Sequence, residues 1–328
     1  MRCHRLDAVT REALRAVVPA VPTSVESHRC DSIQGVSIGP MVARHLHTLV
    51  ARGNTSDVYR WGRHAVVKVL RPGIPDDWAQ REAATTESVH AAGLPAPAVL
   101  DVTTIDGRRA IVFERIDGVS MWARMLTFPG DIPRLSLLLA ELQAEVNATA
   151  APAGIPSLHD RLHDNLVNAR HLSSSERDAA ALALERRPRH GGLCHFDIHP
   201  NNVLMGPLDP VIIDWFDASA GSPEADIARS SVLMRRSASH GHLECADPSV
   251  IELVHDEYLA AVLRTRHVDD EALLAWEPSV LAGRLAEPVI EAIQTETADA
   301  LRLLEASRPT ALSSGLRLAR SSLSISRP

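Results

Sequence analysis

At 328 residues the chain can bury a sizeable core and has room for two lobes or domains. Its hydrophobic content of 45% and charged content of 23% are those of an ordinary globular protein, and its net charge of -7 argues against nucleic acid or an anionic membrane as the main partner. No apolar run reaches the roughly 18 residues of a transmembrane helix. The N-terminus lacks the apolar segment of a signal peptide and the 4 cysteines form no disulfide pattern, so we expect a reduced, cytoplasmic protein.

Residues 1–41 show no sustained period, and we expect them to form a poorly ordered N-terminal extension. The pattern changes near residue 44. Residues 45–50, 58–61 and 65–70 read as strands, and a turn of glycine and small polar residues separates the first two. Backbone N–H groups and hydroxyls in such a turn can approach phosphate oxygens closely.

The third of these strands carries the only lysine of the chain, Lys68, because the other 33 of the 34 Lys and Arg residues are arginines. Where arginine fills nearly every basic position, a solitary lysine indicates a place that requires a compact point charge. Chance is the alternative, and the neighbouring motifs argue against it.

A helix is predicted over residues 78–92, with Asp76 and Asp77 as caps at its start and Gly93 at its end. Two more strands, residues 97–104 and 108–113, are joined at Asp106 and Gly107, a dipeptide typical of hairpin turns.

From residue 133 onward the chain becomes helical. Apolar residues at 135, 138, 139, 142 and 146 share one helix face. A second helix lies within residues 159–171, and a capping box of Ser173 and Glu176 opens a third that runs to residue 187. Later helices start at Ser222 and at Asp247, each followed by proline, and others run to residue 282 and over residues 288–306.

The stretch from His195 to Trp215 carries the chemistry. Asp197 and Asn202 lie five residues apart on a loop before a short apolar strand, and the next apolar strand ends at Asp214. Carboxylate and amide oxygens such as those of Asp214 and Asn202 suit Mg²⁺ on a nucleoside triphosphate. Asp197 can orient a hydroxyl and accept its proton during attack on a γ-phosphate. The alternative is a buried loop whose Asp and Asn only cap turns.

The pattern H-x-D-x-x-x-x-N, a strand and I-D-W resembles the catalytic core of the aminoglycoside phosphotransferase and choline kinase-like families, relatives of the protein kinases. The resemblance implies an α+β, two-lobed, protein-kinase-like fold. Residues 42–117 would form a small antiparallel-sheet N-lobe, residues 118–306 a larger, mainly helical C-lobe, and residues 307–328 a disordered tail. The absence of A-P-E and of a long segment between Asp214 and Pro223 argues against a protein kinase.

By this resemblance the turn after Gly53 covers the phosphates, and Glu82 holds Lys68 on the α- and β-phosphates, with Glu87 as its rival for that role. The stretch after Phe113 would be the hinge, where the Glu114 carbonyl and the Ile116 N–H bind adenine. Phe113 itself would face the adenine pocket, pack in the core, or do both. The implied nucleotide-binding residues are Gly53, Asn54, Thr55, Ser56, Lys68, Glu82, Phe113, Glu114 and Ile116, with Asp197 as catalytic base and Asn202 and Asp214 as metal ligands.

Four further residues have expected roles beside these. Phe196 stands where the family often has glycine and would narrow the acceptor site, while His199 is expected to organise the loop. Asp217 is a candidate for an additional metal contact or for a loop cap. Asp226, in the family pattern P-x-x-D-[LI]-A, is expected to support the catalytic loop from behind.

The implied activity is transfer of the γ-phosphate of ATP, with Mg²⁺, to a hydroxyl of a small molecule. An aminoglycoside or similar basic antibiotic leads, because acidic residues outnumber arginines between residues 250 and 300 and could form a wall for a polyamine. A solvated acidic helix face is the other explanation. Choline-, homoserine-, sugar- and macrolide-type acceptors stay open, as does a silent nucleotide-binding module. No nucleic acid or membrane partner is expected, and the chain is expected to be a monomer or weak homodimer.

Overall fold

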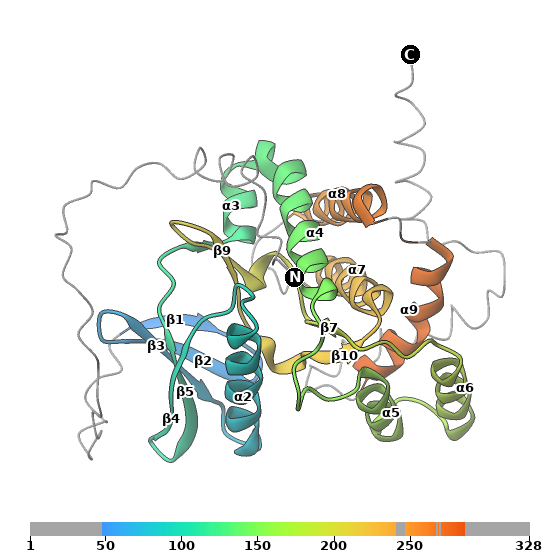
Figure 1. The fold of residues 1–328 in the computed structure, drawn as a ribbon, viewed down its shortest axis with the longest axis horizontal. Coiled ribbons are helices and arrows are strands. Elements are labelled where there is room, and N and C mark those ends of the chain that lie inside the picture. The colour runs from blue at the N-terminus through green and yellow to red at the C-terminus, as the bar shows by residue number, and fades with distance from the viewer. Residues whose placement is uncertain (1–47, 241–246, 267, 269, 286–328) are drawn as a thin grey trace.

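A computed structural model describes residues 48–240, 247–266, 268 and 270–285, and Figure 1 shows their arrangement. An antiparallel sheet with one helix lies beside a larger, mainly helical region, so the predicted α+β class is confirmed. The predicted N-terminal extension, residues 45–47 of the first strand, the helix over residues 288–306 and the tail fall outside the described residues.

The N-lobe sheet has five strands in the order β1-β2-β3-β5-β4. The alternation of side chains puts Lys68 of β3 and Phe113 of β5 on the face that packs against α2, because Leu70, Ile111 and Phe113 share a core with alanines of that helix. The strands are β1 (Leu49–Arg52), β2 (Ser56–Trp61), β3 (Ala65–Leu70), β4 (Val99–Ile105) and β5 (Arg108–Glu114).

The turn between β4 and β5 forms as predicted, because Asp106 and Gly107 both have positive φ, 48° and 75°. Two consecutive positive φ values are those of a type I′ hairpin turn, which glycine enters without strain and aspartate tolerates.

Helix α2 (Asp77–Ala91) confirms the predicted helix, but the predicted side-chain cap is wrong. Asp76 has helical dihedrals and makes no side-chain cap hydrogen bond. The first turn instead begins one residue earlier, because the Trp78 N–H donates to the carbonyl of Pro75 at 3.1 Å. Gly93, at φ 85°, follows the helix end as predicted.

The connection after β5 runs closely along a hairpin of the C-lobe. A Cβ on Gly118 would lie 2.2 Å from the carbonyl oxygen of Met205, so only glycine fits there. The segment continues into β6 (Val119–Ser120), which pairs with β8 (Val203–Met205), and β8 pairs with β9 (Pro210–Ile212). This small sheet places the loop of residues 195–202 beside the segment predicted to be the hinge.

The C-lobe is built on helices. The five apolar residues predicted to share a face of α4 (Ile132–Ala148) are all buried, and α4 packs against α8 (Pro248–Arg266). The predicted capping box opens α6, since the Ser173 hydroxyl accepts from the Glu176 N–H and the Glu176 carboxylate accepts from the Ser173 N–H. The remaining helices are α3 (Met121–Thr127), α5 (Leu158–Asn168), α6 (Ser174–Glu185), α7 (Pro223–His240) and α9 (Asp270–Arg284).

Helix α3 is absent from the sequence-based prediction. Its start is a regular cap, because the Ser120 hydroxyl accepts the Ala123 N–H at 3.1 Å. At seven residues it is too short to show a helical period, and its Met121, Trp122 and Met125 are buried by contacts with the rest of the C-lobe core.

A second small sheet, β7 (Gly192–Cys194) with β10 (Ser219–Gly221), brackets the catalytic stretch. Together β7, β8, β9 and β10 fix both ends of the two loops that carry Asp197 and Asp214. Within the described residues, no helix is long and apolar enough to cross a membrane.

Candidate active site

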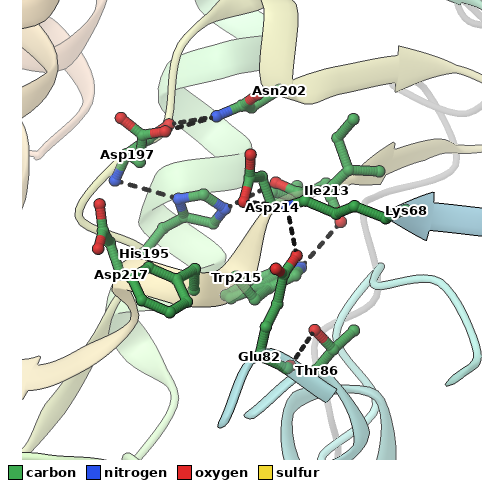
Figure 2. A network of polar contacts seen from close by, with 12 residues as sticks. Lys68, Glu82, Thr86, His195, Asp197, Asn202, Ile213, Asp214, Trp215 and Asp217 are labelled. Atoms are coloured by element: carbon green, nitrogen blue, oxygen red, sulfur yellow. Dashed lines mark hydrogen bonds and ion pairs between the residues drawn. The ribbon is translucent and has the colours of Figure 1, made fainter. Parts of the chain in front are cut away.

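Lys68 lies between two carboxylates from different parts of the chain. Its Nζ is 2.7 Å from Glu82 Oε1 on α2 and 2.9 Å from Asp214 Oδ1, which follows β9 (Figure 2). Lys68 and Glu82 are buried, at 9% and 4% exposure, whereas 41% of the Asp214 side chain is exposed. The structure therefore gives Glu82, rather than its rival Glu87, the contact with Lys68, since Glu87 is exposed.

Charge and burial oppose one another in this group. Burial acts to lower the pKa of Lys68, but Asp214 and Glu82 outweigh it, so the pKa lies above its usual value and the ammonium stays charged. Burial raises the pKa of Glu82 to about 7, although Lys68 acts in the other direction. Lys68 lowers the pKa of Asp214 against the effect of burial.

The loop that carries Asp214 is held in an uncommon conformation. Asp214 has φ 65°, in the left-handed region that aspartate tolerates better than most residues. The Ile213 N–H donates to the Asn202 carbonyl at 2.9 Å, and the indole of the buried Trp215 donates to the Ile212 carbonyl at 2.8 Å. The backbone thus turns sharply after β9 and brings the Asp214 carboxylate to Lys68.

Asp197 and Asn202 meet across the loop that joins β7 to β8. Asn202 Nδ2 donates both to the Asp197 carbonyl and to Asp197 Oδ2, each at 2.9 Å. Because Nδ2 carries both bonds, Oδ1 is the amide atom of Asn202 that can act as a metal ligand.

His195 connects the loop of Asp197 to the segment that leads to Asp214. Its Nδ1 accepts the Asp197 N–H at 3.2 Å, so Nε2 carries the proton and donates to the Ile213 carbonyl at 3.1 Å (Figure 2). Burial lowers the pKa of His195, which favours this neutral form.

Phe196 has φ 62°, which gives a structural reason for the glycine that the family often has at this position. Its N–H donates to Asp226 Oδ1 at 2.7 Å, and its carbonyl accepts from Arg229 Nε at 3.2 Å. Both partners are on α7 and buried. These bonds hold a bulky residue in a strained conformation, and the predicted support of the loop by Asp226 is confirmed.

The supporting network extends further than the sequence indicates. Asp226 Oδ2 accepts from Gln143 Nε2 at 3.1 Å and from Asn147 Nδ2 at 2.8 Å, both on α4. The Tyr258 hydroxyl of α8 in turn donates to Gln143 Oε1. Gln143 and Asn147 interrupt the apolar face of α4 as buried polar residues, which is the one sequence signal that could have identified them.

His199 lies beside Asp197 but does not pair with it as an ion. Its Nε2 is 3.9 Å from Asp197 Oδ2, and burial, followed by the charges of His195 and two arginines, lowers its pKa to about 4. A neutral imidazole near pH 7 agrees with the expected organising role.

The predicted phosphate turn joins β1 and β2. Gly53 and Asn54 are exposed and Thr55 is partly buried, with the Gly53 N–H donating to the Ser56 carbonyl at 2.8 Å. Ser56 is already the first residue of β2, paired with Leu70 and only 4% exposed. Only Gly53, Asn54 and Thr55 therefore form the turn itself.

At the predicted hinge, Glu114 is tied to the segment before β4. Its N–H donates to the Ala98 carbonyl at 2.9 Å, and its carboxylate accepts the Ala98 N–H at 2.8 Å. This leaves the Glu114 carbonyl outside the pair of bonds that joins it to Ala98. Phe113 is 8% exposed within the core between the sheet and α2, and a Cβ on Gly206 would lie 3.5 Å from the side chain of Ile116.

Asp217 does not act as a loop cap through its carboxylate. Oδ1 pairs with Arg161 of α5. Among the described residues, no group of three or more His, Cys, Asp or Glu side chains is arranged to hold a metal ion. A divalent cation here would rely on Asn202, Asp214 and oxygens from a bound ligand and water.

A hollow beside the catalytic loop has no carboxylate in its lining. Of the acidic residues expected to form an acceptor wall, Glu277 pairs with Arg235 and Asp256 bonds His255 at 3.0 Å, while Glu287, Glu291, Glu296 and Asp299 lie outside the described residues. The hollow is lined by Trp122, His199, Pro200, Asn201, Leu233, Met234, Ile251 and Val254.

The model of the phosphotransferase enzyme family matches residues 47–244, which is more than half of the chain. No curated protein matches the sequence at a significant level. Among solved structures, a choline/ethanolamine kinase family protein from Mesorhizobium loti has a TM-score of 0.56 at 17% identity, covering 95% of this chain and 99% of its own.

Two aminoglycoside phosphotransferases are also similar in fold. A thermostable form of APH(4)-Ia, in ternary complex with ADP and hygromycin B, has a TM-score of 0.57 at 17% identity and covers 80% of this chain and 94% of its own. An aminoglycoside-3'-phosphotransferase of type VIII has a TM-score of 0.51 at 20% identity and covers 72% of this chain and 91% of its own. At these identities the likeness establishes the kinase-like fold.

Proposed function

This chain belongs to the phosphotransferase enzyme family, and from that membership we propose that it transfers the γ-phosphate of ATP to a hydroxyl group of a small molecule. The observation that carries the proposal is the position of Lys68 between Glu82 and Asp214. Asp214 lies on the loop next to the one in which Asn202 bonds Asp197. These groups come from β3, α2 and two loops of the C-lobe. Their convergence from four separate segments favours a functional site over incidental packing.

The donor set suits Mg²⁺ better than other common metal ions. Asn202 Oδ1 and the exposed part of the Asp214 carboxylate offer oxygen atoms only, and a site with two protein ligands suits an ion that keeps several waters and binds phosphate. When bound, Mg²⁺ would neutralise negative charge on the phosphates.

The residues of the chain then have separate tasks. The Lys68 ammonium has three donors, of which Glu82 and Asp214 accept two, so the third is available to a phosphate oxygen. Asp197 orients the acceptor hydroxyl and takes its proton, while the Asn202 amide holds the Asp197 carboxylate in one orientation. Gly53, Asn54 and Thr55 approach the phosphates. The Glu114 carbonyl and the Ile116 N–H, at the hinge, bind the adenine ring.

The acceptor has two candidate classes. An aminoglycoside or similar basic antibiotic is the first, supported by the aminoglycoside phosphotransferases among the proteins of similar fold. A choline-, homoserine-, sugar- or macrolide-type hydroxyl compound is the second, supported by the choline/ethanolamine kinase family protein among the proteins of similar fold.

A silent nucleotide-binding module is the alternative outside enzymes. It would be expected to have lost Lys68, Asp197, Asn202 or Asp214, and the chain retains all four.

The deciding experiment measures ADP release from Mg-ATP by purified protein against a panel of acceptors. The panel contains kanamycin-, streptomycin- and hygromycin-type compounds, a macrolide, choline, homoserine and amino sugars, with Asp197→Ala as control. An acceptor-dependent signal that the variant lacks supports the proposal and chooses between the two acceptor classes. Failure to bind Mg-ATP would refute it.

A further inference from the structure

Phe216 lies two residues after Asp214 and contacts two side chains of α2. Its ring centroid is 4.4 Å from that of Trp78, at an interplanar angle of 34°, and the Arg81 guanidinium lies 4.0 Å from the ring centroid. Trp78 is four residues before Glu82 and therefore on the same side of the helix, and Arg81 is the neighbour of Glu82. The first turns of α2 thus contact the segment that carries Asp214.

Arg161 of α5 contacts the same ring from the C-lobe. Its Cζ lies 5.9 Å from the Phe216 ring centroid, its Nη1 donates to the Phe216 carbonyl at 3.5 Å, and its Nη2 pairs with Asp217. We call Trp78, Arg81, Arg161, Phe216 and Asp217 the Phe216 cluster.

The charges within the Phe216 cluster explain how two arginine side chains can lie close together. Arg81 and Arg161 repel one another, and after burial this repulsion is the next cause that lowers the pKa of Arg81, while Asp217 acts in the opposite direction. The aromatic face of Phe216 attracts a guanidinium group, and Asp217 offsets the second positive charge. Two arginines can therefore converge on one ring.

We propose that the Phe216 cluster positions α2 and thereby holds Glu82 against Lys68. Trp78, Arg81, Arg161 and Phe216 are positioning residues, because they act on the site through Glu82. The consequence for turnover rests on the proposed phosphotransferase function, whereas the effect on the Lys68–Glu82 contact does not.

Lys68 is the only lysine of the chain, so amine labelling reports on this contact directly. The rate of Lys68 modification by an amine-reactive reagent at pH 9 is followed by peptide mapping, which separates it from the α-amino group. If α2 is displaced, Lys68 loses the Glu82 carboxylate that covers one side of its ammonium group, and the amine becomes more accessible to the reagent. We expect Arg81→Gln and Phe216→Leu to raise the labelling rate at least about threefold, because the site opens more often.

Gln80→Ala is the matched control, because Gln80 is an exposed neighbour of Arg81 on the same helix. It should label at the wild-type rate, and Phe216→Tyr, which keeps the ring, should stay close to it. Circular dichroism and thermal unfolding establish that each variant is folded. Unchanged labelling in folded Arg81→Gln and Phe216→Leu would overturn the proposal.

A double-mutant cycle separates positioning from general packing. In the Glu82→Gln background, Phe216→Leu should change kcat by less than about twofold, because both substitutions act on one contact. Independent, multiplicative effects would instead assign Phe216 a packing role only. If the wild-type protein phosphorylates no acceptor but labelling responds as expected, the proposed function fails and the positioning of α2 stands.

Discussion

The lysine group and the catalytic loop are held by different forces. Lys68, Glu82 and Asp214 come from both lobes and are joined by charge, across distances of 2.7 and 2.9 Å. The loop of Asp197 is held within the C-lobe, where the buried Asp226 accepts the Phe196 N–H and two amide groups of α4. The loop that carries Asp197 is therefore supported by the C-lobe core, whereas the lysine group also depends on where α2 lies.

The largest effect should come from Asp197, the proposed base. Asp197→Ala should reduce turnover by about 10²- to 10⁴-fold, the usual contribution of a positioned general base. Mg-ATP affinity should change little, because Asp197 is assigned to the acceptor. Turnover from ADP release and affinity from calorimetry test this, and a variant that keeps its turnover would remove Asp197 from that role.

Lys68→Arg should come next, with a fall in kcat/KM for ATP of about 10- to 100-fold, because a planar guanidinium cannot replace a compact ammonium held between two carboxylates. The site is 9% exposed, so the larger head must also displace its neighbours. Wild-type kinetics would end the assignment of Lys68.

Part of the site and part of the fold can be predicted from local sequence patterns. The sequence predicts one site from the motif of Asp197, Asn202 and Asp214 and from the solitary Lys68, and the structure places Lys68 against Asp214 and Asn202 against Asp197, while their roles stay predictions. Helix faces and the capping box of α6 were predictable because each is a local pattern. The choice of Glu82 over Glu87 needed the resemblance, because either residue is acidic and on the same helix.

Contacts between distant segments could not be predicted. Nothing near Phe196 in the sequence indicates that Gln143, Asn147 and Tyr258 stabilise its loop, since these residues lie on α4 and α8. The glycine that the family often has at position 196 is the only signal for the positive φ of Phe196, because phenylalanine itself normally disfavours that conformation. Asp76 failed as a cap because the Pro75 carbonyl begins the helix one residue earlier.

Asp226→Asn should weaken the hydrogen bonds that hold the loop of Asp197 and leave the contacts of Lys68 unchanged. Asp226 accepts from the Phe196 N–H and from two side-chain amides, so an Asn NH₂ would face a donor in any orientation. We expect a loss of about 2–4 kcal/mol in the free energy of unfolding together with reduced turnover. Urea denaturation and kinetics measure the two effects, and full turnover in a destabilised variant would separate the network from catalysis.

Glu82→Gln should alter the lysine group and leave the loop of Asp197 intact. We expect turnover to fall about tenfold, while the free energy of unfolding at pH 8 stays close to that of the wild type. Burial raises the pKa of Glu82 to about 7, above its unfolded value, so its contribution to stability is present at low pH and lost as the pH rises through 7. A wild-type kcat/KM for ATP that falls below pH 7, and a flat profile in Glu82→Gln, would agree with this. Glu87→Gln, on an exposed residue of the same helix, is the control.

His199→Gln should give the smallest effect at neutral pH and a distinct one in acid. The pKa of His199 is about 4 in the folded chain and near 6.5 when unfolded, so the unfolded state binds more protons and wild-type stability falls as the pH drops from 6.5 towards 4. Between pH 7 and pH 5 the variant should lose about 2 kcal/mol less than the wild type, from urea denaturation at each pH. His163→Gln, at an exposed position of α5, should follow the wild-type curve. Equal acid sensitivity of all three proteins would mean that His199 can take up a proton in the folded state, and its contact with Asp197 at 3.9 Å would then be an ion pair between the loop and the base.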